Sequence, residues 1–427
     1  MPAVLALRTQ RAARSPLPLN REPGGARVIS HTFSDEELLE RRGVSLKDPV
    51  NEDLFRLREA LKPFCEQNGG KVTVSTIEQH WAVIGHCERA VRRHHPKHRE
   101  LANELWGHLV RACESVVRHA DWPATNERWK AVRRILLKAS TDPLPIASSN
   151  DDAKEDGWPI WGWPAPRLDA ARGLLFLIYR LGCADKQATA ALLRLSRDKS
   201  HPLRFNMADR LSVLEQAEPK LMWQLIDRFI RYERKFSVLE MVVNSLNNLW
   251  SRAAQEVKPR LARIAERAMQ NAPDGNHIFE TLAHAHLFPF LRTGNAECEA
   301  FVNTLIAECD RQRASHALAV QLHTCRAGRW LTAGDGVKIV DVEETVRKRT
   351  WGFFGKLLFA AQEKLQQHRE RWQRLHAAGQ PNADELKTTS EATNRTSQLV
   401  DAGTYDFLLC VIDENESAPR NESRGWA

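Results

Sequence analysis

The chain has 427 residues, of which 42% are hydrophobic and 27% are charged. These fractions are typical of folded proteins, so most of the chain can bury a core and extensive disorder is excluded. No segment approaches the roughly 20 consecutive apolar residues of a membrane helix, which argues against a membrane span. The eight cysteines form no C-x-x-C pair and follow no export signal, so we expect reduced thiols in a soluble, cytoplasmic protein.

The N-terminal third begins with a basic segment and continues with helices. Residues 1–30 contain five arginines, several prolines and one acidic residue. We expect a flexible basic arm there, with an organellar transit peptide as the alternative. Residues 31–140 form the predicted N-terminal helical region, in which Ser34 is placed to cap a helix with an acidic first turn.

Two basic segments lie within this helical region, and the net charge of the whole chain is +8. A surface of this kind can follow a phosphate backbone, so nucleic acid is one candidate partner. The acidic residues interleaved with the basic ones favour the alternative, an ordinary solvated helix face. The candidate phosphate-binding residues are Arg92, Arg93, Lys130, Arg133, Arg134 and Lys138.

Residues 141–165 are rich in proline, aspartate, serine and glycine, so we expect a linker or a large loop. The segment contains Trp158, Trp161 and Trp163 close to several acidic residues. Three indoles can receive a peptide, a cationic group or an unstacked base, which makes them candidate partner-binding residues. The alternative is that they cover the exposed end of a helical array, and we favour this second interpretation.

A repeated pattern begins at Pro166 and predicts pairs of helices over residues 166–376. Its clearest copy has Asp198 in a turn, Pro202 in the first turn of the next helix and Ala208 one turn later. Asp198 can accept turn amides, proline suits a first helical turn, and alanine lets helices approach closely. Further helix openings fall at Ser237 and near Asn276, Ser315 and Trp351. The resulting period is about 37 residues, within the range of helical repeats.

The second helix of each pair is expected to have one apolar and one charged face. After Pro219, the apolar positions are Leu221, Met222, Leu225, Ile226, Phe229 and Ile230. The opposite face carries Arg231 and Arg234, which we name as candidate partner-binding residues. Arg204, in the preceding turn, is expected to hold that turn together instead.

No motif predicts catalysis. Gly352 to Lys356 resembles the end of a phosphate-binding loop but lacks the spacer and the preceding strand that such a loop needs. The donor types that suit zinc lie at irregular spacing on two predicted helices, at Cys309, His316, His323 and Cys325. We therefore predict no catalytic, cofactor-binding or metal-binding residue. Residues 377–427 are expected to be a polar, disordered tail with one short apolar segment.

The region from Pro166 to about Trp250 resembles HEAT-like repeats. Its residue pattern is similar to that of the C-terminal repeat region of large bacterial STAND or NACHT-type ATPases. The resemblance implies an all-α chain with an α-solenoid of HEAT-like helix pairs. In that family such repeats sense or bind a partner while a separate NTPase module signals. This chain has no such module, so the resemblance implies a protein partner, for which a separate NTPase subunit is one candidate.

The leading hypothesis is a non-enzymatic scaffold or sensor module that binds a protein partner. The alternative is a nucleic-acid-binding HEAT-like protein or, more remotely, an enzyme similar to the HEAT-like DNA glycosylases. No motif of those glycosylases is matched.

Overall fold

The computed structural model describes residues 34–64, 72–93, 96–146, 159, 164–327, 344–377 and 382–417. Within these ranges the chain forms fifteen α-helices and no strand, which confirms the all-α class. None of the described helices is long and apolar enough to cross a membrane. The chain divides into two compact units, residues 1–52 and 53–427.

The described part of the first unit contains α2 (Asp35–Arg41). Its expected cap is confirmed, because Ser34 Oγ accepts the amide of Glu37 at 3.2 Å and Glu37 accepts the amide of Ser34 at 2.7 Å. This reciprocal pair satisfies two amides that the first turn of a helix leaves unpaired. Leu39 is the buried residue of the helix.

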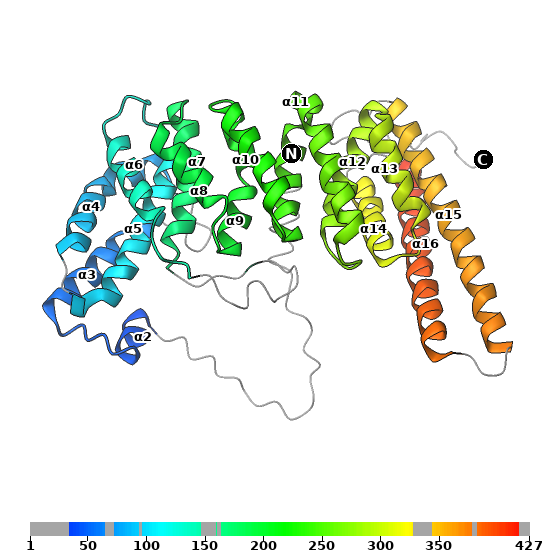
Figure 1. Ribbon diagram of the computed structural model, residues 1–427, viewed down its shortest axis with the longest axis horizontal. Coiled ribbons are helices and arrows are strands. Elements are labelled where there is room, and N and C mark those ends of the chain that lie inside the picture. The colour runs from blue at the N-terminus through cyan, green and yellow to red at the C-terminus, as the bar shows by residue number, and fades with distance from the viewer. Residues whose placement is uncertain are drawn as a thin grey trace, which may run out of the picture. The chain divides into compact units, whose positions relative to one another are not determined.

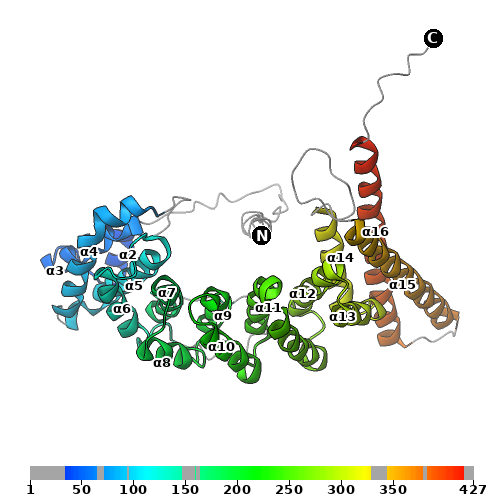
Figure 2. The same ribbon diagram turned by 90° about the horizontal axis from the view of Figure 1, so that it is seen from above.

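The helix α3 (Pro49–Ala60) contains the boundary between the units, and the rest of the second unit follows it. Its helices are α4 (Val74–Arg93), α5 (Arg99–His119), α6 (Arg128–Ala139), α7 (Pro166–Leu181), α8 (Lys186–Leu195), α9 (His201–Ala208), α10 (Pro219–Tyr232), α11 (Phe236–Asn271), α12 (Ile278–Thr293), α13 (Ala296–Ala307), α14 (Gln312–Ala327), α15 (Glu344–Ala377) and α16 (Ala383–Ser417). In this unit α4 packs on α5, α5 on α7, α7 on α9, and α9 on α11. The series continues from α11 to α12 and α14, so helices that are close in the chain are neighbours in space (Figures 1 and 2).

The expected helix openings agree with the observed ones. Helices α7, α9 and α11 begin at Pro166, His201 and Phe236, at or one residue before the predicted positions. The later helices α12, α14 and α15 begin two to seven residues from the predicted openings. The six apolar positions predicted after Pro219 are all buried on α10. Local turn signals and helical periodicity therefore place these elements well.

Contacts that α11 makes with α9 and with the short turn after α9 span 36 or 37 residues of the chain. His201 Nε2 lies 2.8 Å from Ser237 Oγ, 36 residues on, and Ser245 Oγ donates to the carbonyl of Ala208, 37 residues back. Arg252 pairs with Glu215 at the same offset of 37 residues. These three contacts hold α9 and the turn after it against α11.

Arg204 holds its turn, as expected. Its Nη1 donates to the carbonyl of Asp198 at 2.6 Å, and its Nε lies 2.7 Å from a carboxylate oxygen of buried Glu233. The same carboxylate accepts the amides of Arg234 and Lys235. Arg204 of α9 therefore connects the turn before α9 with the turn after α10.

Arginines also cap the C-terminal ends of helices. A helix leaves its last four carbonyls without an internal donor, and its C-terminal end attracts positive charge. In this chain, arginines of later helices donate to carbonyls in the last turn of earlier helices or just beyond it. They are Arg180 at α5, Arg194 at α6, Arg267 at α10, Arg313 at α11 and Arg349 at α12.

The C-terminal region differs from the expected disordered tail. Residues 383–417 form α16, which packs against α14 and α15. Its buried positions include Thr389, Ala392, Thr396 and Leu399, at helical spacing. Small and hydroxyl-bearing residues occupy most of these buried positions. The segment therefore has a polar composition, although one face of its helix is packed.

Candidate binding surfaces

A groove lies between α4 and α6, which both pack against α5. It encloses about 480 Å³ and is lined by Trp81, Glu88, Arg89 and Arg92 of α4 and by Arg134 of α6, among others. Helical spacing explains the lining, because Trp81, Glu88 and Arg92 lie seven and four positions apart along one face, and Arg89 is adjacent to Glu88. We call this the α4–α6 groove. It joins the two basic segments that the sequence analysis singled out.

The electrostatics of the α4–α6 groove depend on Glu88. Arg134 pairs with both oxygens of this carboxylate, at 3.0 and 2.7 Å, and Arg92 approaches one of them to 2.5 Å. The hydrogen bond from Arg134 lowers the pKa of Glu88. No carboxylate of the described residues pairs with exposed Arg89. Two guanidinium groups thus share one carboxylate and the third, that of Arg89, has none among the described residues, which leaves two net positive charges among these four groups.

Aromatic side chains continue from one end of the groove. Trp81 lies edge-to-face with Trp122, with ring centroids 4.9 Å apart, and Trp122 packs on buried Trp129 at 5.0 Å. The guanidinium of Arg128 lies over Trp81 and Trp122, 5.5 and 4.9 Å from the ring centroids. Glu78 accepts hydrogen bonds from Arg128, which lowers the pKa of this carboxyl group. The groove therefore ends at a stacked aromatic and cationic surface.

Most of the other candidate phosphate-binding residues have partners within the chain. Arg133 lies 2.5 Å from a carboxylate oxygen of Asp185, and Lys130 lies 2.8 Å from Glu127. Lys138 lies over the ring of Trp106, 4.9 Å from its centroid. Arg93 is exposed. The structure thus brings Arg92 and Arg134 together at Glu88, and does not show six free cations along one face.

A second basic surface surrounds Tyr232 at the end of α10. The guanidinium of Arg197 lies 4.2 Å from the centre of the Tyr232 ring, and that of Arg231 lies 5.9 Å from it. A hydrogen bond from Arg231 lowers the pKa of Tyr232, which is 52% exposed. Burial and the charge of Arg197 lower the pKa of Arg228. Among the described residues, no carboxylate pairs with these three arginines.

We call this surface the Tyr232 patch. It contains Arg231, one of the two partner-binding residues predicted on α10. The other, Arg234, is exposed and donates its backbone amide to Glu233. The three tryptophans of the predicted loop, Trp158, Trp161 and Trp163, lie outside the described residues, so their role stays a prediction.

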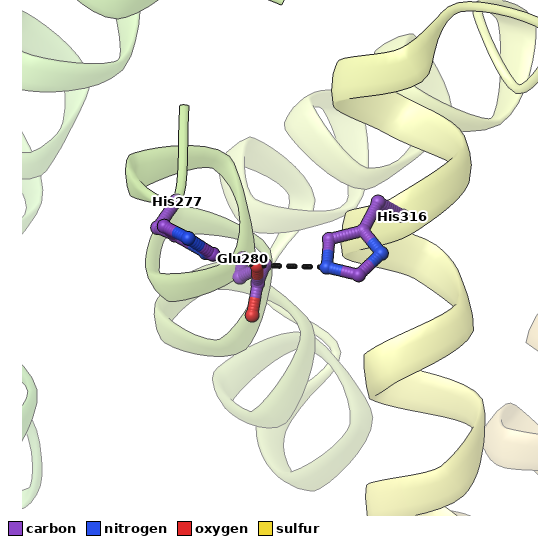
Figure 3. Close-up of side chains that lie close together, drawn as sticks. All are labelled: His277, Glu280 and His316. Atoms are coloured by element: carbon purple, nitrogen blue, oxygen red, sulfur yellow. Dashed lines mark hydrogen bonds and ion pairs between the residues drawn. The ribbon is translucent and has the colours of Figure 1, made fainter. Parts of the chain in front are cut away.

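A cluster of metal-ligand types connects α12 with α14. His277, Glu280 and His316 place their ligand atoms within 4.8 Å of one another (Figure 3). The zinc-ligand types considered from sequence are not together here, because Cys309 and Cys325 are buried while His316 and His323 are exposed. The sequence pattern that could have indicated this cluster is the His-x-x-Glu spacing of His277 and Glu280. This spacing places both side chains on one helix face.

These features define an all-α protein with two cationic surfaces and one candidate metal-ligand cluster. No protein-family model matches the chain, and no curated protein matches it. The functional assignment accordingly depends on the geometry of these surfaces.

Proposed function

We propose that the protein is a non-enzymatic helical-repeat scaffold or sensor module that binds an acidic segment of a protein partner in the α4–α6 groove. The main supporting observation is that Arg92 and Arg134 share the single carboxylate of Glu88. Arg89 and the indole of Trp81 line the same groove. This arrangement offers fixed positive charge and an aromatic contact in one concave surface.

The charge balance of the groove favours a carboxylate-bearing ligand. Glu88 is engaged by Arg92 and Arg134, whereas Arg89 has no acidic partner among the described residues. An entering carboxylate completes the neutralisation and can accept two parallel N–H groups from one guanidinium. Hydrogen bonds to charged groups contribute about 1.5–3 kcal/mol each, enough for a few of them to hold a peptide.

The same observations favour protein over nucleic acid. Affinity for a nucleic acid grows with the number of phosphates that are neutralised. Arg92, Arg133, Arg134 and Lys130 already pair with carboxylates of this chain, so each phosphate contact competes with an internal ion pair. A short acidic segment needs fewer contacts and fits a pocket of about 480 Å³.

The Tyr232 patch supplies a second surface for the same chemistry. Three arginines lie around an exposed tyrosine without an acidic partner among the described residues. Mutual repulsion of unpaired cations is relieved when an anionic group binds, and tyrosine with arginine is a frequent composition of binding hot spots. We infer that this patch binds a second acidic segment of the same protein partner.

The contacts of α11 with α9 and with the turn after α9 support the proposed α-solenoid. Contacts at offsets of 36 and 37 residues match the period of about 37 residues that the sequence pattern gives. Stacked helix pairs of this type present extended binding surfaces. The resemblance to STAND and NACHT-type repeat regions makes a separate NTPase subunit the first protein to test as partner.

The proposal is tested with a fluorescein-labelled peptide that alternates glutamate with leucine and tryptophan, titrated with the full chain. We expect saturable binding at low salt and a loss of at least about tenfold in affinity for Arg89→Glu and Arg134→Glu. Arg263→Glu is the matched control, because Arg263 is exposed on α11 and outside both surfaces. The proposal fails if the peptide does not bind, or if all three variants lose affinity equally.

A further inference from the structure

We propose that His277, Glu280 and His316 form a binding site for a zinc ion at the seam between α12 and α14. The site is independent of the acidic-partner proposal, since it uses other residues on other helices.

The local sequence brings His277 and Glu280 together, and the packing of α12 against α14 adds His316. His277 is the residue before the first turn of α12 and Glu280 lies in that turn, three positions on, so both project from the same face. The turn is fixed by Asn276, whose side chain accepts the amide of Ile278 at 3.0 Å. On α14, Gln321 donates to the carbonyl of Glu280 at 3.2 Å, which ties the two helices together beside the site.

The distances are close to those of a metal site. One oxygen of Glu280 lies 2.7 Å from His277 Nδ1 and 3.1 Å from His316 Nε2, and Figure 3 shows both imidazoles turned toward this carboxylate. Zinc binds imidazole nitrogen at about 2.0–2.1 Å and carboxylate oxygen at about 2.0–2.2 Å, so tetrahedral ligand atoms lie about 3.3 Å apart. Small side-chain rotations convert the observed triangle into that arrangement.

The donor set selects the kind of metal. Two imidazoles and one carboxylate suit zinc and neighbouring transition metals, whereas calcium and magnesium require mainly oxygen ligands. Glu280 is 15% exposed and forms the base of the site, while His277 and His316 are 56% and 62% exposed. A water molecule can therefore complete the fourth position, as in zinc sites with three protein ligands.

A metal at this position has a consequence that an ion pair lacks. A histidine–carboxylate ion pair at the surface contributes little to stability and needs no metal. A zinc ion held by both α12 and α14 binds the folded chain in preference to the unfolded one, so it raises the thermal midpoint with concentration. Binding needs neutral imidazoles, so zinc affinity falls at acidic pH.

The test is a titration of the chelator-stripped full chain with zinc, followed by calorimetry and thermal unfolding. We expect one zinc per chain with an affinity in the micromolar range, a higher thermal midpoint, and visible absorption of a tetrahedral site when cobalt replaces zinc. His277→Ala, His316→Ala and Glu280→Gln should each weaken binding by at least about tenfold.

The control is His323→Ala, which removes another exposed histidine of α14, seven residues beyond His316. It should leave zinc binding unchanged. The proposal is overturned if no saturable zinc binding is seen, or if His316→Ala binds zinc as tightly as the control does. Cobalt binding with the near-ultraviolet absorption of thiolate ligands would also overturn it, because it would assign the metal to cysteine.

Discussion

Asp169 on α7 is a carboxyl group that the fold holds largely away from water. Its side chain is buried, and its Oδ2 has no hydrogen-bond partner among the described residues. Burial raises the pKa of Asp169 to about 7; the charges of Arg172 and Arg111 oppose this shift, and that of Glu114 adds to it. Asp169 is therefore protonated in the folded chain under mildly acidic conditions.

This raised pKa predicts that stability declines as pH rises. Between about pH 4 and 7 the unfolded chain has lost the proton of Asp169 while the folded chain retains it, so rising pH favours unfolding. Asp169→Asn removes the titration and keeps the shape. From pH 5 to pH 8 we expect the stability of the variant to increase relative to the native chain by about 2–3 kcal/mol. Urea unfolding at both pH values measures this, and a constant difference would contradict the assignment.

Some residue roles follow from the sequence and others do not. Ser34 and Arg204 were assigned correctly because caps and turns depend on neighbours a few positions away. His316 was weighed with Cys309 and Cys325, although the structure places it beside His277 and Glu280. The three side chains come together because α12 packs against α14, and this packing cannot be predicted from a local sequence pattern.

At the scale of the helices, arginine side chains repeatedly cap the C-terminal ends of neighbouring helices. Arg180 of α7 donates to the carbonyls of Val117 and Arg118 at the end of α5, at 3.0 and 2.6 Å. These bonds satisfy two carbonyls and place a positive charge at the negative end of the helix. They also fix α5 against α7, which are neighbours in the packed unit.

Replacing Arg180 with methionine should therefore destabilise the chain. Methionine keeps much of the aliphatic stem but removes both donors, and we expect a loss of about 1–3 kcal/mol in the free energy of unfolding. Urea denaturation gives this value. Arg263→Met is the control, since Arg263 is exposed on α11 and should change stability little. An equal effect of the two substitutions would mean that the bonds to the α5 carbonyls contribute nothing.

The helices themselves were predicted unevenly. Those that open at Pro166, Pro202 and Ser237 carry strong local signals, so their positions were close to the observed ones. Helix α16 was missed because Thr389, Thr396 and similar residues fill its buried face. The hydroxyl of Thr396 is satisfied within the helix, where it donates to the carbonyl of Ala392 at 2.7 Å. A buried face made of such residues therefore does not appear as an apolar stripe in the hydropathy of the sequence.

For the molecule as a whole, net charge is a poor guide to the partner. The chain carries a net charge of +8, yet many arginines cap helices or pair with carboxylates of the same chain. Arginines without a carboxylate partner among the described residues include Arg89 in the α4–α6 groove and Arg197, Arg228 and Arg231 in the Tyr232 patch. Sequence reasoning identified the basic segments but could not show which of their charges are already neutralised, because the carboxylate partners lie up to 52 residues away.

The most direct test of this account compares the acidic peptide with labelled single- and double-stranded DNA and RNA in one anisotropy experiment, at about 50 and 200 mM salt. The account predicts saturable binding of the peptide, weakened by Arg134→Glu, and weaker binding of each nucleic acid. Tighter binding of a nucleic acid than of the peptide, with a steep loss on adding salt, would contradict it and identify the basic segments as a phosphate-binding surface.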